Sequence, residues 1–156
     1  RIVRRLIVVA LVAALAASAA LAGLALAASS PTKPATVKTR HVSLGTIVVD
    51  GKSHTLYLFE KDKNGKSKCS GACAQNWPPL LTKGKPKASG SVKASKLGTT
   101  KRSDGTTQVT YGGHPLYTFV LDHNKPGSTK GEGVDAFGAE WYVVGTNGKK
   151  IEKEGS

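Results

Sequence analysis

The residues best suited to chemistry in this chain are two cysteines, Cys69 and Cys73, in the stretch CSGAC. Together with His54, His114 and His123 they could supply soft or borderline ligands to a transition metal or haem. Their CxxxC spacing is not the CxxC of a thioredoxin-like site, and no His follows as in haem attachment. In an exported protein the default state of such a pair is a disulfide. We therefore predict a disulfide and no cofactor, with metal binding, haem binding or a redox role as the alternative.

Two aspartates, Asp62 and Asp122, each end a stretch that reads His-x-x-Tyr-x-Phe-x-x-Asp. Two carboxylates brought together could act as the catalytic pair of a glycosidase. An Asp directly after a strand can instead accept backbone N–H bonds and fix a turn, which is what we expect here. Nothing in the chain resembles a nucleophile elbow. We predict that the protein is not an enzyme.

The duplicated stretch indicates an internal repeat, because the matching residues are separated by a constant 60 positions. Tyr and Phe two residues apart on a strand share one face, so these aromatics should form the core of a small domain. A Trp follows in each copy, and we expect both Trp side chains to be buried. The repeat motif is predicted to be structural, with a binding site as a further role: His54, Tyr57, Phe59, Asp62, Trp77, His114, Tyr117, Phe119, Asp122 and Trp141.

The elements that must position these residues are short β-strands. Alternating β-branched and aromatic runs separated by Gly-containing turns predict a small, duplicated, antiparallel all-β domain of six or seven strands. Strands at 42–50 and 54–60 should form a hairpin, 114–122 should be another strand, and one helical turn is expected around Ala72–Asn76. The predicted organisation is a disordered linker at 29–40, a β domain at 41–146 with repeats at about 42–81 and 97–146, and a polar tail at 147–156.

Residues 1–28 have the pattern of an export signal. The cationic start RIVRR precedes an apolar run from Leu6 to Ala28, and the small residues at Ala25 and Ala27 suit a signal peptidase. The run is also long enough to serve as an uncleaved signal anchor helix. Both alternatives place the β domain outside the cytoplasm or at the outer face of the envelope.

The chain is strongly basic, with 23 Lys and Arg against 10 Asp and Glu. Such a surface attracts polyanions, and export makes nucleic acid a poor partner. Anionic cell-wall polymer or lipid headgroups are the expected partners. The stretch from Thr82 to Lys96 has no acidic residue and carries the predicted polyanion-binding lysines: Lys83, Lys85, Lys87, Lys93 and Lys96.

From Val42 to Val144 the chain resembles the bacterial secreted-repeat family, also described as predicted lipoproteins with a Yx(F/W/Y)xxD motif. The resemblance rests on LYLFEKD and CSGACAQNWPPL in the first repeat, and on DGTTQVTYGGHPLYTFVLD, KPGSTKGEGV and WYVV in the second. It implies an exported, envelope-associated protein of two repeats whose activity is not established. Lipoproteins of the family carry a Cys directly after the signal. This chain has LALAASSPT there, so lipid anchoring is not expected.

Overall fold

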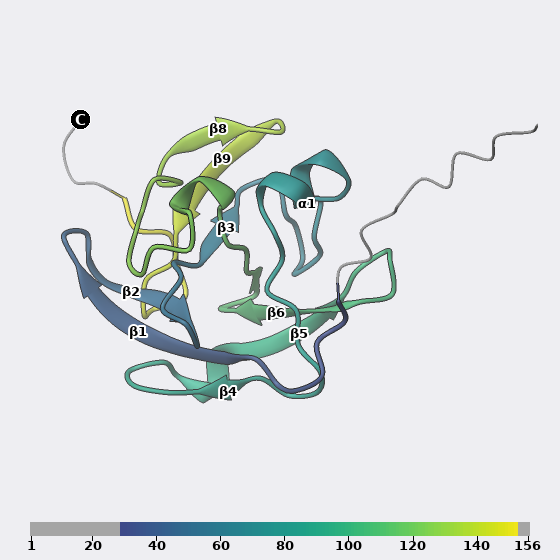
Figure 1. Cartoon of the computed structure of the whole chain (residues 1–156), viewed down its shortest axis with the longest axis horizontal. Coiled ribbons are helices and arrows are strands. Elements are labelled where there is room, and N and C mark those ends of the chain that lie inside the picture. Colours follow the sequence, from purple (N-terminus) through teal and green to yellow (C-terminus); the bar gives the residue numbers. More distant parts are fainter. Residues whose placement is uncertain (1–28, 153–156) are drawn as a thin grey trace, which may run out of the picture.

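The structure is a computed structural model that describes residues 29–152. Within these residues the chain forms nine short β-strands in three sheets, one α-helix and two 3₁₀ turns (Figure 1). The all-β prediction is confirmed, whereas the expected six or seven strands were too few because several strands have only two or three residues. The predicted signal or anchor helix at 1–28 lies outside the described residues, and no helix among those described is long and apolar enough to span a membrane.

The first sheet has the order β2-β1-β4. Strands β1 (Thr36–Val42) and β2 (Gly45–Asp50) form an antiparallel hairpin, and β4 (Lys87–Ala88) pairs with β1 in parallel. The prediction of a disordered linker at 29–40 is therefore wrong from Thr36 onward. The Pro and Ser residues at its start favoured a linker, but the residues that follow form a strand in which Val37 is fully buried.

The second sheet, β3-β9-β8, joins the two repeats. Strand β3 (Tyr57–Phe59) comes from the first repeat, and β8 (Val134–Ala136) and β9 (Ala139–Val143) come from the second. The predicted hairpin of 42–50 with 54–60 is largely replaced, because β3 pairs with β9 and the β pairing between the two segments is limited to a Val49–Thr55 bridge.

The third sheet has the order β5-β6-β7, from β5 (Leu97–Lys101), β6 (Thr107–Tyr111) and β7 (His114–Pro115). The strand predicted at 114–122 stops at Pro115 and gives way to the 3₁₀ turn η2 (Val120–Asp122). The helical turn predicted at Ala72–Asn76 is confirmed as α1 (Ala72–Asn76), and a second 3₁₀ turn, η1 (Ala94–Lys96), precedes β5.

Two hydrophobic clusters lie on opposite faces of the central strands. In β2, Ile47 and Val49 enter one cluster whereas Val48 enters the other. In the same way Tyr57 and Phe59 alternate with Leu58. These strands are buried on both faces, so a single-residue shift in register would exchange the two sets of core side chains. Beyond β9, Ile151 donates its amide N–H to Val143 O at 2.8 Å, which extends the β domain past the predicted limit of 146.

Candidate functional site

The two motif tyrosines meet at the centre of the molecule. The amide of Tyr57 donates to Tyr117 O at 2.8 Å, and the amide of Tyr117 donates to Tyr57 O at 3.0 Å. This reciprocal antiparallel pair relates equivalent residues of the two repeats by an approximate twofold axis.

Each tyrosine hydroxyl bonds the aspartate of the other repeat. Tyr57 donates to Asp122 Oδ2 at 2.7 Å, and Tyr117 donates to Asp62 Oδ2 at 2.7 Å. We call these two cross-repeat pairs the Tyr–Asp interlock. The motif therefore joins the two repeats. We had expected each aspartate to act only within its own strand and turn.

Asp122 also organises the loop that follows it. Its Oδ1 accepts bonds from Ser128 Oγ at 2.7 Å and from the Lys130 amide at 3.0 Å. The Gly131 amide donates to the Tyr57 hydroxyl at 3.2 Å. A Cβ on Gly131 would lie 2.7 Å from the Tyr57 ring, so the close approach of this loop requires glycine.

Asp62 has a different environment. Its Oδ1 accepts the Lys68 amide at 2.7 Å, and the Tyr117 hydroxyl also lies 2.7 Å from Ser67 Oγ. Arg102 extends this network from the second repeat, donating to Ser67 Oγ at 2.9 Å and to the carbonyl of Cys69 at 2.7 Å.

Burial keeps both tyrosine hydroxyls protonated. Desolvation raises the pKa of Tyr57 and of Tyr117 far above the usual 10, and the neighbouring carboxylates raise each pKa further. Desolvation also raises the pKa of Asp62. Because each carboxylate oxygen of Asp62 and Asp122 already has a donor within 3.0 Å, the geometry favours fixed hydrogen bonds over proton transfer to a substrate.

The aromatic motif residues form a continuous stack that alternates between the repeats. Phe59 stacks on Trp141, Trp141 on Trp77, and Trp77 on Phe119, with ring centroids 4.0, 3.9 and 3.9 Å apart. Both Trp side chains are buried. Such contacts add to the hydrophobic stabilisation of a small domain.

The predicted disulfide between Cys69 and Cys73 is confirmed, and both residues are buried.

The candidate metal-ligating histidines lie in separate places. His54 Nδ1 lies 2.9 Å from Asp50 Oδ2, and His123 is exposed at the end of η2. His114 is half-buried, and desolvation lowers its pKa. No group of three or more His, Cys, Asp or Glu residues within 29–152 is arranged to hold a metal. The disulfide occupies both sulfurs, so the structure does not support the metal or haem alternative.

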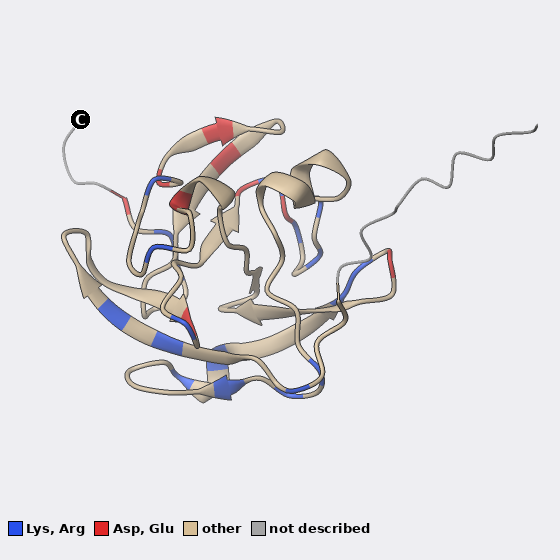
Figure 2. Cartoon of the chain, in the orientation of Figure 1, with Lys and Arg blue, Asp and Glu red and all other residues tan. Residues whose placement is uncertain are grey.

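The predicted polyanion-binding lysines lie in β4 and in the segments on either side of it. Lys83, Lys85, Lys87 and Lys93 are exposed and Lys96 is half-buried. Because β4 pairs with β1, they lie near the basic residues of β1, as Figure 2 shows, whereas β8 and β9, far from β4, each carry an acidic residue.

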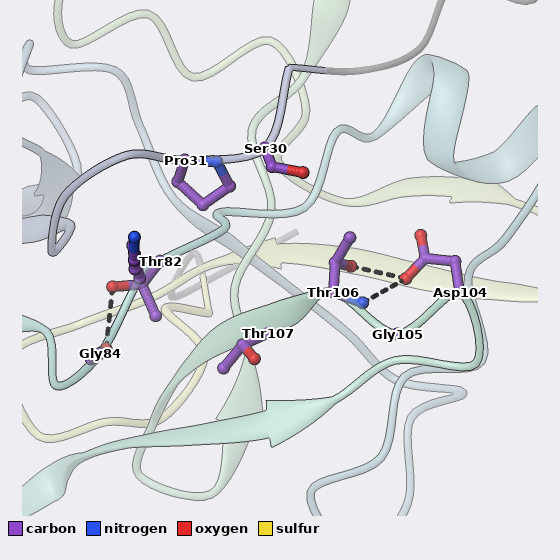
Figure 3. A pocket seen from close by; sticks show the side chains of 9 residues that line it. Ser30, Pro31, Thr82, Gly84, Asp104, Gly105, Thr106 and Thr107 are labelled. Carbon is purple, nitrogen blue, oxygen red and sulfur yellow. Dashed lines mark hydrogen bonds between the residues drawn. The ribbon is translucent and has the colours of Figure 1, made fainter.

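Three surface depressions lie close to these lysines. The first, of about 700 Å³, has Lys87 on its wall together with Asp50. The second, of about 500 Å³, is lined by residues 30–31, 82–84 and 104–107 (Figure 3). Its polar groups are largely paired with one another: Thr82 donates to Gly84 O, and Asp104 accepts two bonds from Thr106 that lower the pKa of its carboxyl. The Asp104 carboxylate also makes this depression unsuitable for an anion.

The third depression, of about 630 Å³, has lysines and threonines on its walls and no acidic residue. Lys66, Lys85 and Lys101 border it, and only Lys85 was among the predicted site residues. Lys66 and Lys101 belong to different repeats, and no local pattern in the sequence connects them. We call this depression the β5 groove.

These features define a class of protein, a two-repeat β protein in which each repeat completes the hydrogen bonding and aromatic packing of the other. The chain belongs to the family described as a secreted repeat of unknown function, whose family model matches residues 38–81 and 98–145, one match in each repeat. No curated protein and no solved structure matches the chain. The match confirms the resemblance found in the sequence and describes the protein as secreted.

Proposed function

We propose that this secreted protein is a non-enzymatic module that binds anionic components of the cell envelope, either wall polymer or lipid headgroups. The main observation behind this proposal is the parallel pairing of β4 with β1. It adds Lys87 and its neighbouring lysines to a sheet that already contains Lys38 and Arg40. Clustered positive charge attracts polyanions and speeds their encounter with the protein. Each lysine near an anionic surface contributes about 1 kcal/mol.

Two further observations support this proposal. No acidic residue occurs from Lys83 to Arg102, so the local field is not cancelled along that segment. The carboxylates of the motif are committed to the Tyr–Asp interlock, which supports a non-enzymatic role.

The test measures binding of the protein to anionic and to neutral vesicles, and to a soluble anionic polymer, over a range of salt concentrations. A five-site variant changes Lys83, Lys85, Lys87, Lys93 and Lys96 to Gln. We expect wild-type binding that weakens as salt rises and is largely lost in the variant.

The matched control changes five other exposed lysines to Gln: Lys52, Lys61, Lys63, Lys125 and Lys130. It removes the same charge from other parts of the surface and should retain most of the binding. Equal binding to neutral and anionic targets, or no binding to any of them, would show that the proposal is wrong.

A further inference from the structure

The β5 groove follows the edge of a strand. All five consecutive residues of β5 line it, opposite the segment 84–86. A ligand on one face of a strand would meet alternate residues, whereas a ligand along its edge meets every residue. Strand β5 ends the sheet β5-β6-β7, so alternate amide N–H groups on its outer side have no partner in that sheet.

The side chains around the groove add donors that the protein itself does not use. Within residues 29–152 the ammonium groups of Lys66 and Lys85 have no ion pair or hydrogen bond, and Lys101 Nζ makes one bond, to Gly105 O at 3.3 Å. Thr99, Thr100 and Thr107 contribute hydroxyls that also lack a hydrogen-bond partner in this part of the chain. Three positive charges and a set of free donors therefore surround a space that no carboxylate borders.

We infer that the β5 groove is the specific binding site for an extended phosphodiester-linked polymer, an inference that rests on the proposed function. A five-residue strand is about 17 Å long, which suits several repeating charges better than one small anion. Lysine binds phosphate as a point charge from many directions, whereas arginine binds carboxylate or phosphate with a fixed fork. No arginine lines the groove.

The shape of the site also distinguishes a polymer from a lipid surface. Headgroups of a bilayer lie in a plane, and a recessed groove between β5 and the segment 84–86 reaches them poorly. A single polymer chain can lie along the strand edge with its phosphates against the lysines. The basic residues of β1 and β4 then contribute attraction at longer range.

The experiment compares two triple variants of the full chain that remove the same charge. The groove variant is Lys66→Gln, Lys85→Gln and Lys101→Gln, and the control is Lys83→Gln, Lys87→Gln and Lys93→Gln. The probes are poly(glycerol phosphate), polyglutamate of matched charge, and phosphatidylglycerol vesicles. We expect the groove variant to lose at least about tenfold more affinity for poly(glycerol phosphate) than the control does, because it loses site contacts as well as net charge. For polyglutamate and vesicles the groove variant should lose no more affinity than the control does.

Three outcomes would overturn the inference and leave the proposed function intact. These are an equal loss in both variants, a wild-type preference for polyglutamate, and a groove effect of the same size on vesicles. If the wild-type chain binds none of the three probes, the proposed function itself fails. The variants change only lysine side chains, and an unchanged unfolding midpoint excludes misfolding as the cause of lost binding.

Discussion

The two halves of the Tyr–Asp interlock have the same connection and different surroundings. Asp122 is 5% exposed and accepts three hydrogen bonds, from the hydroxyls of Tyr57 and Ser128 and from the backbone amide of Lys130. Asp62 is half-buried and accepts one hydroxyl and one amide, with Ser67 as a second neighbour of its tyrosine.

The surroundings of Asp62 include features that the surroundings of Asp122 lack. The Cys69–Cys73 disulfide and the guanidinium of Arg102 both reinforce the chain next to Ser67, on the Asp62 side. The Asp122 side relies on its own loop, which approaches the Tyr57 ring at Gly131. The comparison indicates that the duplicated motif sets the connection between repeats, whereas each loop determines how much stability depends on its aspartate.

The largest expected effect is that of Asp122→Ala. It removes the acceptor of two hydroxyls and an amide in a buried site, where the Tyr57 hydroxyl keeps only Ser128 O, at 3.4 Å. It should lower the free energy of unfolding by about 3 kcal/mol. Asp62→Ala should cost about 1.5 kcal/mol, because Tyr117 keeps Ser67 within bonding distance. Urea unfolding of both variants measures the difference. An exposed control, Asp135→Ala, should change stability by less than about 0.5 kcal/mol. Equal costs at Asp62 and Asp122 would remove the asymmetry.

The disulfide should account for part of the difference between the halves. Changing Cys69 and Cys73 to Ser releases a short loop and should cost about 2 kcal/mol. Hydrogen exchange should then increase in residues 62–73 and stay unchanged in residues 122–131, because local opening follows the loss of local constraints. Reduced wild-type protein is the control and should behave as the Ser variant does. Faster exchange in both loops would mean that the disulfide stabilises the whole fold and not one half.

The repeat and its aromatic core could be predicted from the sequence, because residue types at fixed spacing are what strands and cores require. The exchange of partners between repeats could not be predicted in this way. In a duplicated chain, the motif allows Tyr57 to bond either Asp62 of its own copy or Asp122 of the other copy, and the sequence does not distinguish the two. Only the antiparallel meeting of Tyr57 with Tyr117 decides between them, and that contact is not local.

The β5 groove was missed for a related reason. A strand of two residues, such as β4, has no measurable period, and its parallel pairing with β1 joins segments about 50 residues apart. The lysine run at 83–96 was visible in the sequence, but its placement between β1 and β5 depends on tertiary contacts. Lys66 and Lys101 contribute to the groove through the fold alone.

A smaller effect is expected at two hairpin turns, one in each repeat. Asn64 and Gly65 have φ of 53° and 70°, and Phe137 and Gly138 have φ of 61° and 91°. Asn is well suited to positive φ, whereas an exposed Phe, here 42% accessible, is strained there. Phe137→Asn should therefore raise the free energy of unfolding by about 1 kcal/mol. The control Phe137→Leu keeps an unfavourable side chain and should give no gain. A loss of stability in the Asn variant would show that the Phe137 side chain makes a stabilising contact.

The smallest expected effect concerns the two histidines that begin the motif. His54 has a carboxylate partner, Asp50, at 2.9 Å, whereas no ion pair is found for His114 within residues 29–152. Burial lowers the pKa of His114 below 6.5, and the nearby Lys63 lowers it further, against an opposing contribution from Glu60. A folded-state pKa below the unfolded value means that the stability is present above pH 6.5 and is lost as the pH falls through the folded pKa.

The variant His114→Gln should therefore lose less stability than the wild type when the pH is lowered from 7.5 to 5, and the two should differ little at pH 7.5. Urea unfolding at both pH values measures this difference, and an NMR titration of the wild type should place the pKa of His114 below 6.5. A pKa at or above 6.5 would mean that Glu60 outweighs burial. The asymmetry between the repeats would then be confined to the Tyr–Asp interlock and its loops.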